Sequence, residues 1–337
     1  MELSNIAKQI QKEIEKSSNI LLHCHPYPDP DSIGSVIAMK RYLQYINKNV
    51  TAIIGDSSYP TNLNTLHIEN EIESKSYIDI NTVDYDLFII LDSSSKSQIT
   101  QRAEVEFPKT MKTIVIDHHK TNTEFGDINL LDVASASTTQ IITKLFKEWT
   151  YTISQEIALP LYLGLFADTG GFKYLNTTPE VLKVASELAS INPNFHKAVF
   201  DIENSKEPIE IEMQGLALSS IQRFHNGKIV LSKIPYEIVK EKKLSIEQAM
   251  EGLVADKLRS VYGWDIVASL VEAEPNITTI SLRTRDETRY DLTKVVKVVG
   301  VNGGGHPGAA GTTIYKNIED ASNDLIKNLL DIFGESL

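Results

Sequence analysis

The sequence predicts an α/β protein in which a doubly wound, mostly parallel sheet is followed by a smaller α/β domain. Four short segments of the first half are almost continuously apolar and rich in β-branched residues, as strands buried on both faces of a parallel sheet are. Stretches with helical spacing of apolar residues lie between and after them, and this alternation predicts βα units. The strand segments are NILLHCH, NVTAIIG, DLFIILD and KTIVID, and the helical stretches cover residues 32–47, 137–149 and 154–166.

The pattern changes in the second half of the chain. Helical spacing runs through residues 180–190 and returns near residues 207–222, with a polar stretch that contains Pro193 between the two. We therefore predict a catalytic domain at residues 1–188, a linker at residues 189–212 and a second domain at residues 213–337. Within the second domain we expect strands at residues 228–234, 265–273 and 277–283, helices at residues 246–259 and 291–299, then a glycine-rich loop and a C-terminal helix from Asp320.

Composition limits the class of protein. A chain of 337 residues with 42% hydrophobic residues can bury the cores of two domains. The charged N-terminus predicts an amphipathic helix rather than a signal peptide, and no apolar stretch approaches the ~18 residues that cross a membrane, so we expect a cytoplasmic protein without a membrane partner. Cys24 is the single cysteine and fits a reducing compartment. The net charge of −12 argues against long nucleic acid as a partner.

Acidic and histidine residues follow four apolar runs, at the point where each run ends. In an open α/β sheet the carboxyl ends of the strands form the crevice where ligands bind. We therefore read these runs as strand ends and expect the side chains that follow them to meet at one two-metal site. They are His25, Asp29 and Asp31 after the first run, Asp92 after the second, Asp117, His118 and His119 after the third, and Asp168 after LYLGLFA.

The first of these groups lies on a stiff loop. Prolines at positions 26, 28 and 30 cannot continue a central strand, so the chain turns there and presents Asp29 and Asp31. The alternative is that Asp31 only caps the helix that follows. A histidine and two aspartates in this rigid context favour metal ligation. Cys24 alternates with His23 and His25 along the strand, so it should point to the opposite face, and we expect it to be buried filler. We expect His23 to be structural rather than a ligand.

The other groups carry separate alternatives. Asp92 opens a serine loop, where it could simply form a turn. An acid followed by two adjacent histidines is costly to place in a core, so Asp117, His118 and His119 indicate binding more strongly. One imidazole can hold a metal while the other contacts phosphate, and Asp117 can fix a ring tautomer. Asp168 precedes two glycines that let backbone approach a ligand, although it could also be part of a helix-end turn.

Four aspartates and two histidines suit two divalent cations. Carboxylates supply charge, and imidazole favours a transition metal over Mg²⁺, so Mn²⁺ is the preferred candidate. Two such ions ~3.5–4 Å apart can share a water, lower its pKa and stabilise the charge that develops on phosphorus during in-line displacement. The pattern therefore predicts hydrolysis of a phosphoester or phosphoanhydride.

These residues resemble the four ordered motifs of the DHH phosphoesterase superfamily. In the second half, the segments SLRTR from Ser281 and GGGHPGAAG from Gly303 resemble the DHHA1 substrate-binding domain, so the resemblance covers nearly the whole chain. In this sequence the four motifs are His25-x-x-x-Asp29-x-Asp31 with Gly34-Ser35, then Asp92, then Asp117-His118-His119, then Asp168.

The resemblance implies a role for each motif residue. It assigns one metal to His25 and Asp29, and Asp92 to the bridge between the metals. It assigns the second metal to Asp31, His118 and Asp168. It also implies that the catalytic residues are Asp92, Asp117, His118 and His119, and that the substrate is bound by His119, Arg283, Arg285, Gly304, Gly305 and His306.

The glycine-rich segment has a second possible reading. Gly303 to Gly308 also spells G-x-G-x-x-G, the dinucleotide-binding pattern. Pro307 would break the helix start that this pattern requires, and no Rossmann unit surrounds it, so we set a nicotinamide site aside. The two arginines could also be solvated charges on an edge strand.

The architecture narrows the activity that the resemblance implies. The glycine-rich segment argues against family II pyrophosphatases, and the chain lacks the additional parts of single-strand 5′ exonucleases and of membrane-bound cyclic-dinucleotide phosphodiesterases. We expect a Mn²⁺-dependent hydrolase that releases mononucleotides from short RNA and also dephosphorylates adenosine 3′,5′-bisphosphate. The alternative is a stand-alone phosphodiesterase for cyclic di-AMP or its linear product; a non-catalytic nucleotide-binding protein is less expected. The resemblance also hints at a homodimer.

Overall fold

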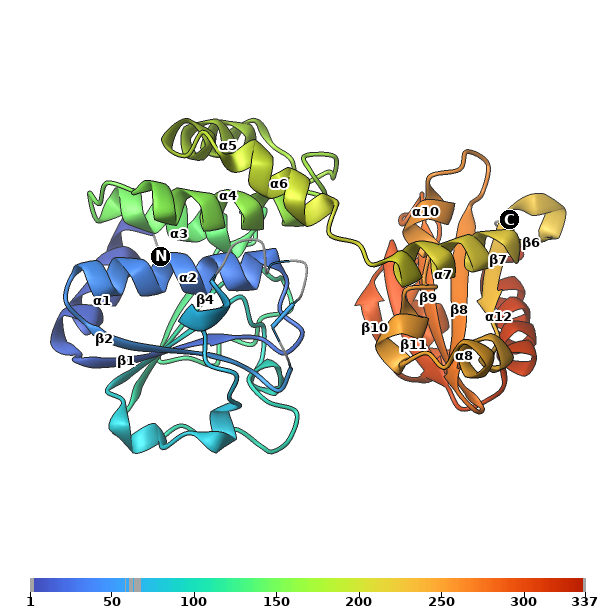
Figure 1. Cartoon of the computed structure of the whole chain (residues 1–337), viewed down its shortest axis with the longest axis horizontal. Helices are drawn as coiled ribbons and strands as arrows, with labels where there is room; N and C mark the ends of the chain where they lie inside the picture. The colour runs from blue at the N-terminus through green and yellow to red at the C-terminus, as the bar shows by residue number, and fades with distance from the viewer. Residues whose placement is uncertain (1–2, 58, 61–62, 64–67, 336–337) are drawn as a thin grey trace. The chain divides into compact units, whose positions relative to one another are not determined.

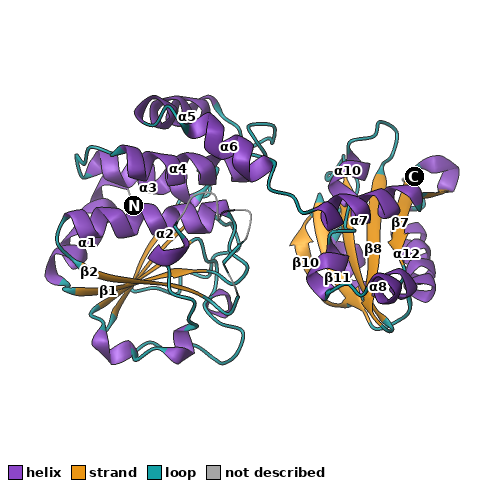
Figure 2. Ribbon diagram, in the orientation of Figure 1, coloured by secondary structure: helices purple, strands orange, loops and turns teal. Residues whose placement is uncertain are grey.

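The computed structural model divides into two compact units, residues 1–205 and 206–337 (Figure 1). Each unit has its own sheet and its own buried cores (Figure 2). The division falls inside residues 189–212, the region in which the sequence analysis places the linker. The structure describes residues 3–57, 59–60, 63 and 68–335.

The first unit is built on a parallel sheet of five strands in the order β2-β1-β3-β4-β5. The four predicted strands are confirmed. The sequence analysis missed β5, because it has four residues and only Leu130 among them is buried, which gives no continuous apolar run. The strands are β1 (Asn19–Cys24), β2 (Asn49–Ile54), β3 (Leu87–Leu91), β4 (Lys112–Asp117) and β5 (Ile128–Leu131).

The α-helices of this unit lie on one side of the sheet, where α1, α2 and α3 contact the strands and α4, α5 and α6 pack on other helices (Figure 1). The other face is covered by 3₁₀ turns and loops, whose buried side chains include Tyr77, Ile99 and Met111. The three predicted helices are confirmed within a few residues. The helices are α1 (Leu3–Lys16), α2 (Pro30–Tyr45), α3 (Thr138–Glu148), α4 (Gln155–Asp168), α5 (Pro179–Ile191) and α6 (Phe195–Glu203).

One apolar run belongs to a helix rather than to a strand. LYLGLFA, which precedes Asp168, forms the last two turns of α4, so the expectation that all four runs are strand ends is wrong for this one. Helix α4 packs against α2, α3 and α5 at once. A helix that is surrounded in this way is apolar on all sides, and a short stretch of it resembles a buried strand. Among the described residues, no helix is long and apolar enough to cross a membrane.

The second unit is a mixed sheet of six strands in the order β10-β11-β9-β8-β7-β6. Only β7 and β8 pair in parallel. Helices α11 and α12 pack on one face, and α7 to α10 cover part of the other. The elements are α7 (Pro208–Ser219), β6 (Gln222–Phe224), β7 (Ile229–Ile234), α8 (Tyr236–Lys242), α9 (Ile246–Met250), α10 (Ala255–Arg259), β8 (Ile266–Glu274), β9 (Ile277–Thr284), α11 (Thr293–Val299), β10 (Val301–His306), β11 (Ala309–Ile314) and α12 (Ile318–Phe333).

The glycine-rich segment is a β-hairpin, which corrects the predicted loop. Glycine has low strand propensity, so the sequence indicates a loop; the pairing of β11 with β9 overrides that preference. Across the hairpin Gly304 pairs with Gly311 and His306 with Ala309. The helix predicted at residues 246–259 is split into α9 and α10, and the C-terminal helix begins at Ile318 rather than at Asp320.

Candidate metal centre

The strand order places the predicted site residues at the switch point of the first sheet. β1 lies between β2 and β3, so the chain leaves β1 in one direction and returns on its other side. In such sheets a crevice opens outside the carboxyl ends of the strands where the order reverses. His25 directly follows β1, Asp92 directly follows β3, and Asp117 is the last residue of β4.

The start of α2 brings two carboxylates to this crevice. Asp29 is the N-cap, and its Oδ1 accepts hydrogen bonds from the backbone N–H groups of Asp31 and Ser32, each at 2.9 Å. Asp31 is fully buried and does not cap its own helix. Its carboxylate accepts from the N–H of Thr138 at 2.7 Å, and from the N–H and Oγ1 of Thr139 at 2.9 and 2.7 Å.

The N-terminus of α3 therefore points at Asp31 and stabilises its negative charge. The sequence predicts a helix from residue 137 but gives no role to Thr138 and Thr139. Polar residues at the start of a helix are common, so only the fold shows that these two face a carboxylate of another element.

Close packing of α2 and α4 brings Asp168 into the same place. A Cβ atom at Gly34 would lie 2.4 Å from the carbonyl oxygen of Pro160, and one at Gly164 would lie 2.8 Å from Oδ1 of Asp31. Real Cβ atoms do not approach other atoms so closely, so both positions require glycine. Because the helices touch here, Asp168 at the end of α4 lies beside Asp31 at the start of α2.

Asp92 lies between the three histidines. Its backbone is left-handed, with φ 54°, and its side chain is buried. The Asp92 carboxylate is 3.5 Å from Nε2 of His25, 3.6 Å from Nε2 of His118 and 3.7 Å from Nδ1 of His119. It also accepts a hydrogen bond from Oγ1 of Thr138 at 3.0 Å.

The structure thus brings together all eight site residues predicted in the first half, and we call them the Asp/His cluster. Their ligand atoms form three groups in which every atom lies within 4.8 Å of the others. Two of the groups coincide with the two ligand sets that the family resemblance implies. Asp92 belongs to one of these two groups and also to the remaining group. The groups are His25, Asp29 and Asp92; Asp31, His118 and Asp168; and Asp92, Asp117, His118 and His119.

His118 shows that the cluster fits a cation. Within the part of the chain that the structure describes, its Nε2 is buried and has no hydrogen-bond partner, although Oδ2 of Asp168 is only 3.3 Å away. A buried polar atom without a partner is costly, and a metal ion would satisfy it. The oxygen and imidazole donors around it are those that divalent transition metals accept.

The pKa values show how the carboxylates oppose one another. Burial, and then the charges of Asp31 and Asp92, raise the pKa of Asp168 to about 11. Burial and the neighbouring carboxylates also raise the pKa of Asp29 and of Asp31. Burial alone would raise the pKa of Asp92, but His25, His118 and His119 together outweigh it and the pKa is lowered. Divalent cations would relieve this repulsion and keep the carboxylates ionised.

The histidines are shifted by the same charges. Burial disfavours the protonated ring of His25, but the Asp92 carboxylate outweighs burial and raises the pKa of His25 to about 9. The hydrogen bond to Asp117 raises the pKa of His119 to about 9 as well.

Asp117 positions His119. Its Oδ1 lies 2.8 Å from Nδ1 of His119 and also accepts the N–H of His118 at 2.8 Å. Its Oδ2 accepts from Nδ2 of Asn122 at 2.7 Å, a residue that sequence reasoning missed. The His119 side chain keeps 34% of its surface exposed, whereas Asp117 has none. The arrangement fixes the ring of His119 and leaves its Nε2 available to a ligand.

His23 and Cys24, the last two residues of β1, are buried, as expected for structural residues. His23 is fully buried, its Nε2 lies 3.0 Å from the carbonyl oxygen of Ile99, and burial lowers its pKa to about 3. Cys24 is buried in the core, where burial raises the pKa of its thiol.

The predicted substrate-binding residues of the second unit lie together at one end of its sheet. Ala309 pairs with Arg283 on one side and with His306 on the other, so the three residues share one face. Gly304 and Gly305 precede His306 on β10 and are exposed. Nε and Nη2 of Arg283 each donate to the carboxylate of Asp256 at 3.0 Å.

Arg285 is held differently. Its Nη1 donates to the carbonyl oxygen of Ser260 at 3.2 Å, and its guanidinium lies 6.0 Å from the ring centroid of Tyr262.

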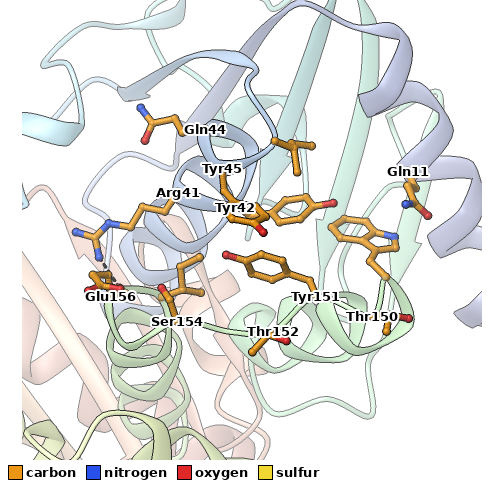
Figure 3. A pocket seen from close by; sticks show the side chains of 13 residues that line it. Gln11, Arg41, Tyr42, Gln44, Tyr45, Thr150, Tyr151, Thr152, Ser154 and Glu156 are labelled. Carbon is orange, nitrogen blue, oxygen red and sulfur yellow. Dashed lines mark hydrogen bonds between the residues drawn. The ribbon is translucent and has the colours of Figure 1, made fainter.

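A hollow of about 770 Å³ lies at the other end of α2 (Figure 3). It is lined by the rings of Tyr42, Tyr45, Trp149 and Tyr151, and it contains no member of the Asp/His cluster. Asp29 begins α2 and Tyr45 ends it, so the length of the helix separates the hollow from the cluster. We do not assign the chemistry to this hollow.

A parallel sheet with an Asp/His cluster at its switch point, joined to a second unit with a glycine-rich hairpin, defines a metal-dependent phosphoesterase. The model of the DHH family, N-terminal domain, matches residues 19–165, and the model of the DHHA1 domain matches residues 226–335. The chain belongs to the DHH/DHHA1 phosphoesterases.

Curated relatives match over nearly their whole length. The protein is 27% identical over 324 residues to the bifunctional oligoribonuclease and PAP phosphatase NrnA of Thermus thermophilus, covering 93% of this chain and 89% of that protein. It is 24% identical over 314 residues to the protein of the same name from Bacillus subtilis, covering 91% and 93%. The crystal structure of an exopolyphosphatase-related protein from Bacteroides fragilis superposes with a TM-score of 0.88 at 23% identity, covering 97% of this chain and 96% of that one, and shows the same fold.

Proposed function

We propose that the protein is a Mn²⁺-dependent hydrolase that releases mononucleotides from short oligoribonucleotides and also removes a phosphate from adenosine 3′,5′-bisphosphate. The observation that carries the proposal is the meeting of two ligand groups beside Asp92, which suits two cations on one phosphoester. The names of the relatives from Thermus thermophilus and Bacillus subtilis support the substrate class.

In the proposed mechanism each group of the cluster has one task. His25 and Asp29 would hold one cation, and Asp31, His118 and Asp168 would hold the second, with the carboxylate of Asp92 available to both. When bound there, the cations would activate a water and offset the negative charge that develops on the phosphoester.

Protein groups hold the substrate in line for this attack. Asp117 accepts from Nδ1 of His119, so Nε2 of His119 is free to hold the phosphate that reacts. Thr138 and Thr139 keep the carboxylates of Asp31 and Asp92 in place through their hydrogen bonds. Oriented donors of this kind contribute to catalysis because they need no rearrangement in the transition state.

The second unit supplies the anion-binding residues of the proposal. A Cβ atom at Gly304 would meet no atom within 4 Å, so the backbone there is open to a ligand. Arg283 and His306 share the face beside it, and Asp256 holds the guanidinium of Arg283 in a fixed orientation. Because Nε and Nη2 of Arg283 already donate to Asp256, and Nη1 donates to Ser281 and Leu282, the guanidinium offers its positive charge to a phosphate rather than a free pair of donors.

The substrate class is tested by comparing the rates of hydrolysis of different substrates. The purified protein with Mn²⁺ should hydrolyse a 5′-phosphorylated RNA of two to five nucleotides, and adenosine 3′,5′-bisphosphate, with higher kcat/KM than cyclic di-AMP. Products are quantified by chromatography. Faster loss of cyclic di-AMP would replace the proposal with second-messenger turnover, and a 30-nucleotide RNA serves as the control that should react poorly.

Changes in the second unit should act on binding rather than on the chemical step. We expect His306→Ala and Arg283→Gln each to raise KM for short RNA about tenfold while kcat changes little, because binding is lost without disturbing the cluster. The matched control is Asp256→Asn, which weakens the ion pair but keeps the guanidinium, and it should have a smaller effect than Arg283→Gln. An unchanged KM in both variants would remove the second unit from substrate binding.

A further inference from the structure

We propose that Tyr27 and Tyr174 are stacking surfaces for the two nucleobases that flank the phosphate bound at the Asp/His cluster. The inference rests on the proposed function and extends it, because it names the groups that would recognise the nucleoside parts of the substrate. Both tyrosines lie on loops that carry cluster residues, and both are exposed, at 81% and 50% of their surface.

Tyr27 is held in an unusual backbone conformation beside two cluster residues. It lies midway between His25 and Asp29, and two residues of extended chain span at most about 7 Å. Its φ is 55°, which is rare for a bulky residue. Its backbone N–H donates to Oγ of Ser57 at 2.7 Å, and prolines on either side stiffen the loop. This conformation fixes the position of the loop while the ring remains in solvent.

Tyr174 is fixed through its ring as well as its backbone. A Cβ atom at Gly170 would lie 2.4 Å from two ring atoms of Tyr174, so the ring lies flat against that glycine. The N–H of Tyr174 donates to the carbonyl oxygen of Thr169 at 3.0 Å. The loop then returns to the cluster, because Nδ2 of Asn176 donates to the carbonyl oxygen of Asp168 at 3.0 Å.

The surroundings of Tyr174 leave room for a planar group. The ring lines a cavity of about 260 Å³ together with Pro30 and Phe166. Pro30 stands between the cluster residues Asp29 and Asp31, so this cavity adjoins the start of α2. One side of the ring is occupied by Gly170, and the exposed half remains for a base.

The chemistry of the substrate fits two such surfaces. A phosphodiester has a nucleoside on each side of its phosphorus, and a base can stack on an aromatic ring whatever its identity. Exposed tyrosines also occur elsewhere, for example Tyr45 and Tyr315, at 70% and 67%. Tyr27 and Tyr174 differ from these because their loops begin or end on cluster residues and their backbones are held by the hydrogen bonds described above.

The experiment compares alanine variants on substrates that lack one base. Tyr27→Ala, Tyr174→Ala and the control Tyr45→Ala are assayed with Mn²⁺ on a diribonucleotide and on its two analogues that are abasic on one side or the other. Each of the first two variants should lose about 5- to 100-fold in kcat/KM on the diribonucleotide. Each loss should vanish on the analogue that lacks the base stacked on that tyrosine. The control Tyr45→Ala, and the variants Tyr27→Phe and Tyr174→Phe, which keep an aromatic ring, should match the wild type.

The outcomes separate the inference from the proposed function. Equal losses on the diribonucleotide and on both analogues would mean a structural defect, and no loss at all would mean that the rings do not touch the bases; either result overturns the inference. If the wild type hydrolyses no diester, the proposed function fails, and binding of AMP and ribose 5-phosphate to the Mn²⁺-loaded protein then decides. Tighter binding of AMP that is lost in the two variants supports stacking, and equal binding of the two ligands rejects it.

Discussion

Replacing Asp92 with Asn should abolish hydrolysis while leaving the fold intact. The change removes the charge that we place between the two cations but keeps the size of the side chain. Asparagine tolerates the left-handed backbone at this position, where φ is 54°, and its amide oxygen can still accept the hydrogen bond from Thr138. Loss of the shared ligand should lower kcat/KM by about 10³-fold or more, which corresponds to about 4 kcal/mol of transition-state stabilisation.

Three measurements check this prediction. Hydrolysis of short RNA gives the rate, mass spectrometry or plasma emission gives the metal content, and circular dichroism reports the fold. Asp84→Asn is the matched control, because Asp84 is exposed and precedes β3 whereas Asp92 follows it. A variant at position 92 that retains near-normal turnover, with full metal content, would defeat the two-cation arrangement.

Removing metal should abolish turnover and destabilise the first unit. Without cations, burial and then the charges of neighbouring carboxylates raise the pKa values of Asp29, Asp31 and Asp168, so holding them ionised is costly. Mn²⁺ at 100 times its Kd would stabilise the folded state by about 2.7 kcal/mol. For a unit of this size that corresponds to a rise in Tm of about 5–10 °C. Differential scanning calorimetry with chelator and with added Mn²⁺ measures the change, and Asp92→Asn should show a smaller one.

The same prediction has a pH dependence. His25 and His119 have pKa values of about 9 in the folded protein, against about 6.5 when unfolded. The metal-free protein therefore binds more protons when folded, so this contribution to stability is present below pH 6.5 and is lost as the pH rises through 9. Asp168, with a pKa of about 11, acts in the same direction.

Bound Mn²⁺ should weaken the dependence of Tm on pH. Because cations replace protons in the cluster, the Tm of the loaded protein should fall less between pH 7 and pH 9 than the Tm of the chelated protein. Parallel decreases for the two forms would show that the cluster does not bind the metal, and an equal Tm at every pH would show the same.

The fold of the first unit could be predicted from the sequence where the pattern of apolar residues fits one kind of element only. Buried parallel strands are continuously apolar, so β1, β2, β3 and β4 were predictable. The short edge strand β5 was not, because a partly exposed strand has no continuous apolar run. The run before Asp168 was read both as part of a helix at residues 154–166 and as a strand end, because a helix surrounded by helices has no polar face, and the helix is the correct reading. The glycine hairpin of β10 and β11 was missed because glycine has low strand propensity. These residues form strands because β11 pairs with β9 and β10 pairs with β11.

The sequence by itself determined which residues of the first unit gather at the candidate centre. Their chemistry is unusual after an apolar run, and the carboxyl ends of neighbouring strands meet in any sheet of this kind. The grouping of His25, Asp29 and Asp92 apart from Asp31, His118 and Asp168 agrees with the ligand sets that the family resemblance implies, whereas the order of the motifs alone does not separate Asp31 from Asp29.

Only the tertiary structure decided what supports and surrounds the cluster. The hydrogen bonds from Thr138 and Thr139, and the contact of α2 with α4 at Gly34, join segments that are far apart in the sequence, and no local pattern encodes their approach. Their positions follow from how helices pack on the sheet, and packing depends on the shapes of all the side chains between them rather than on any one segment.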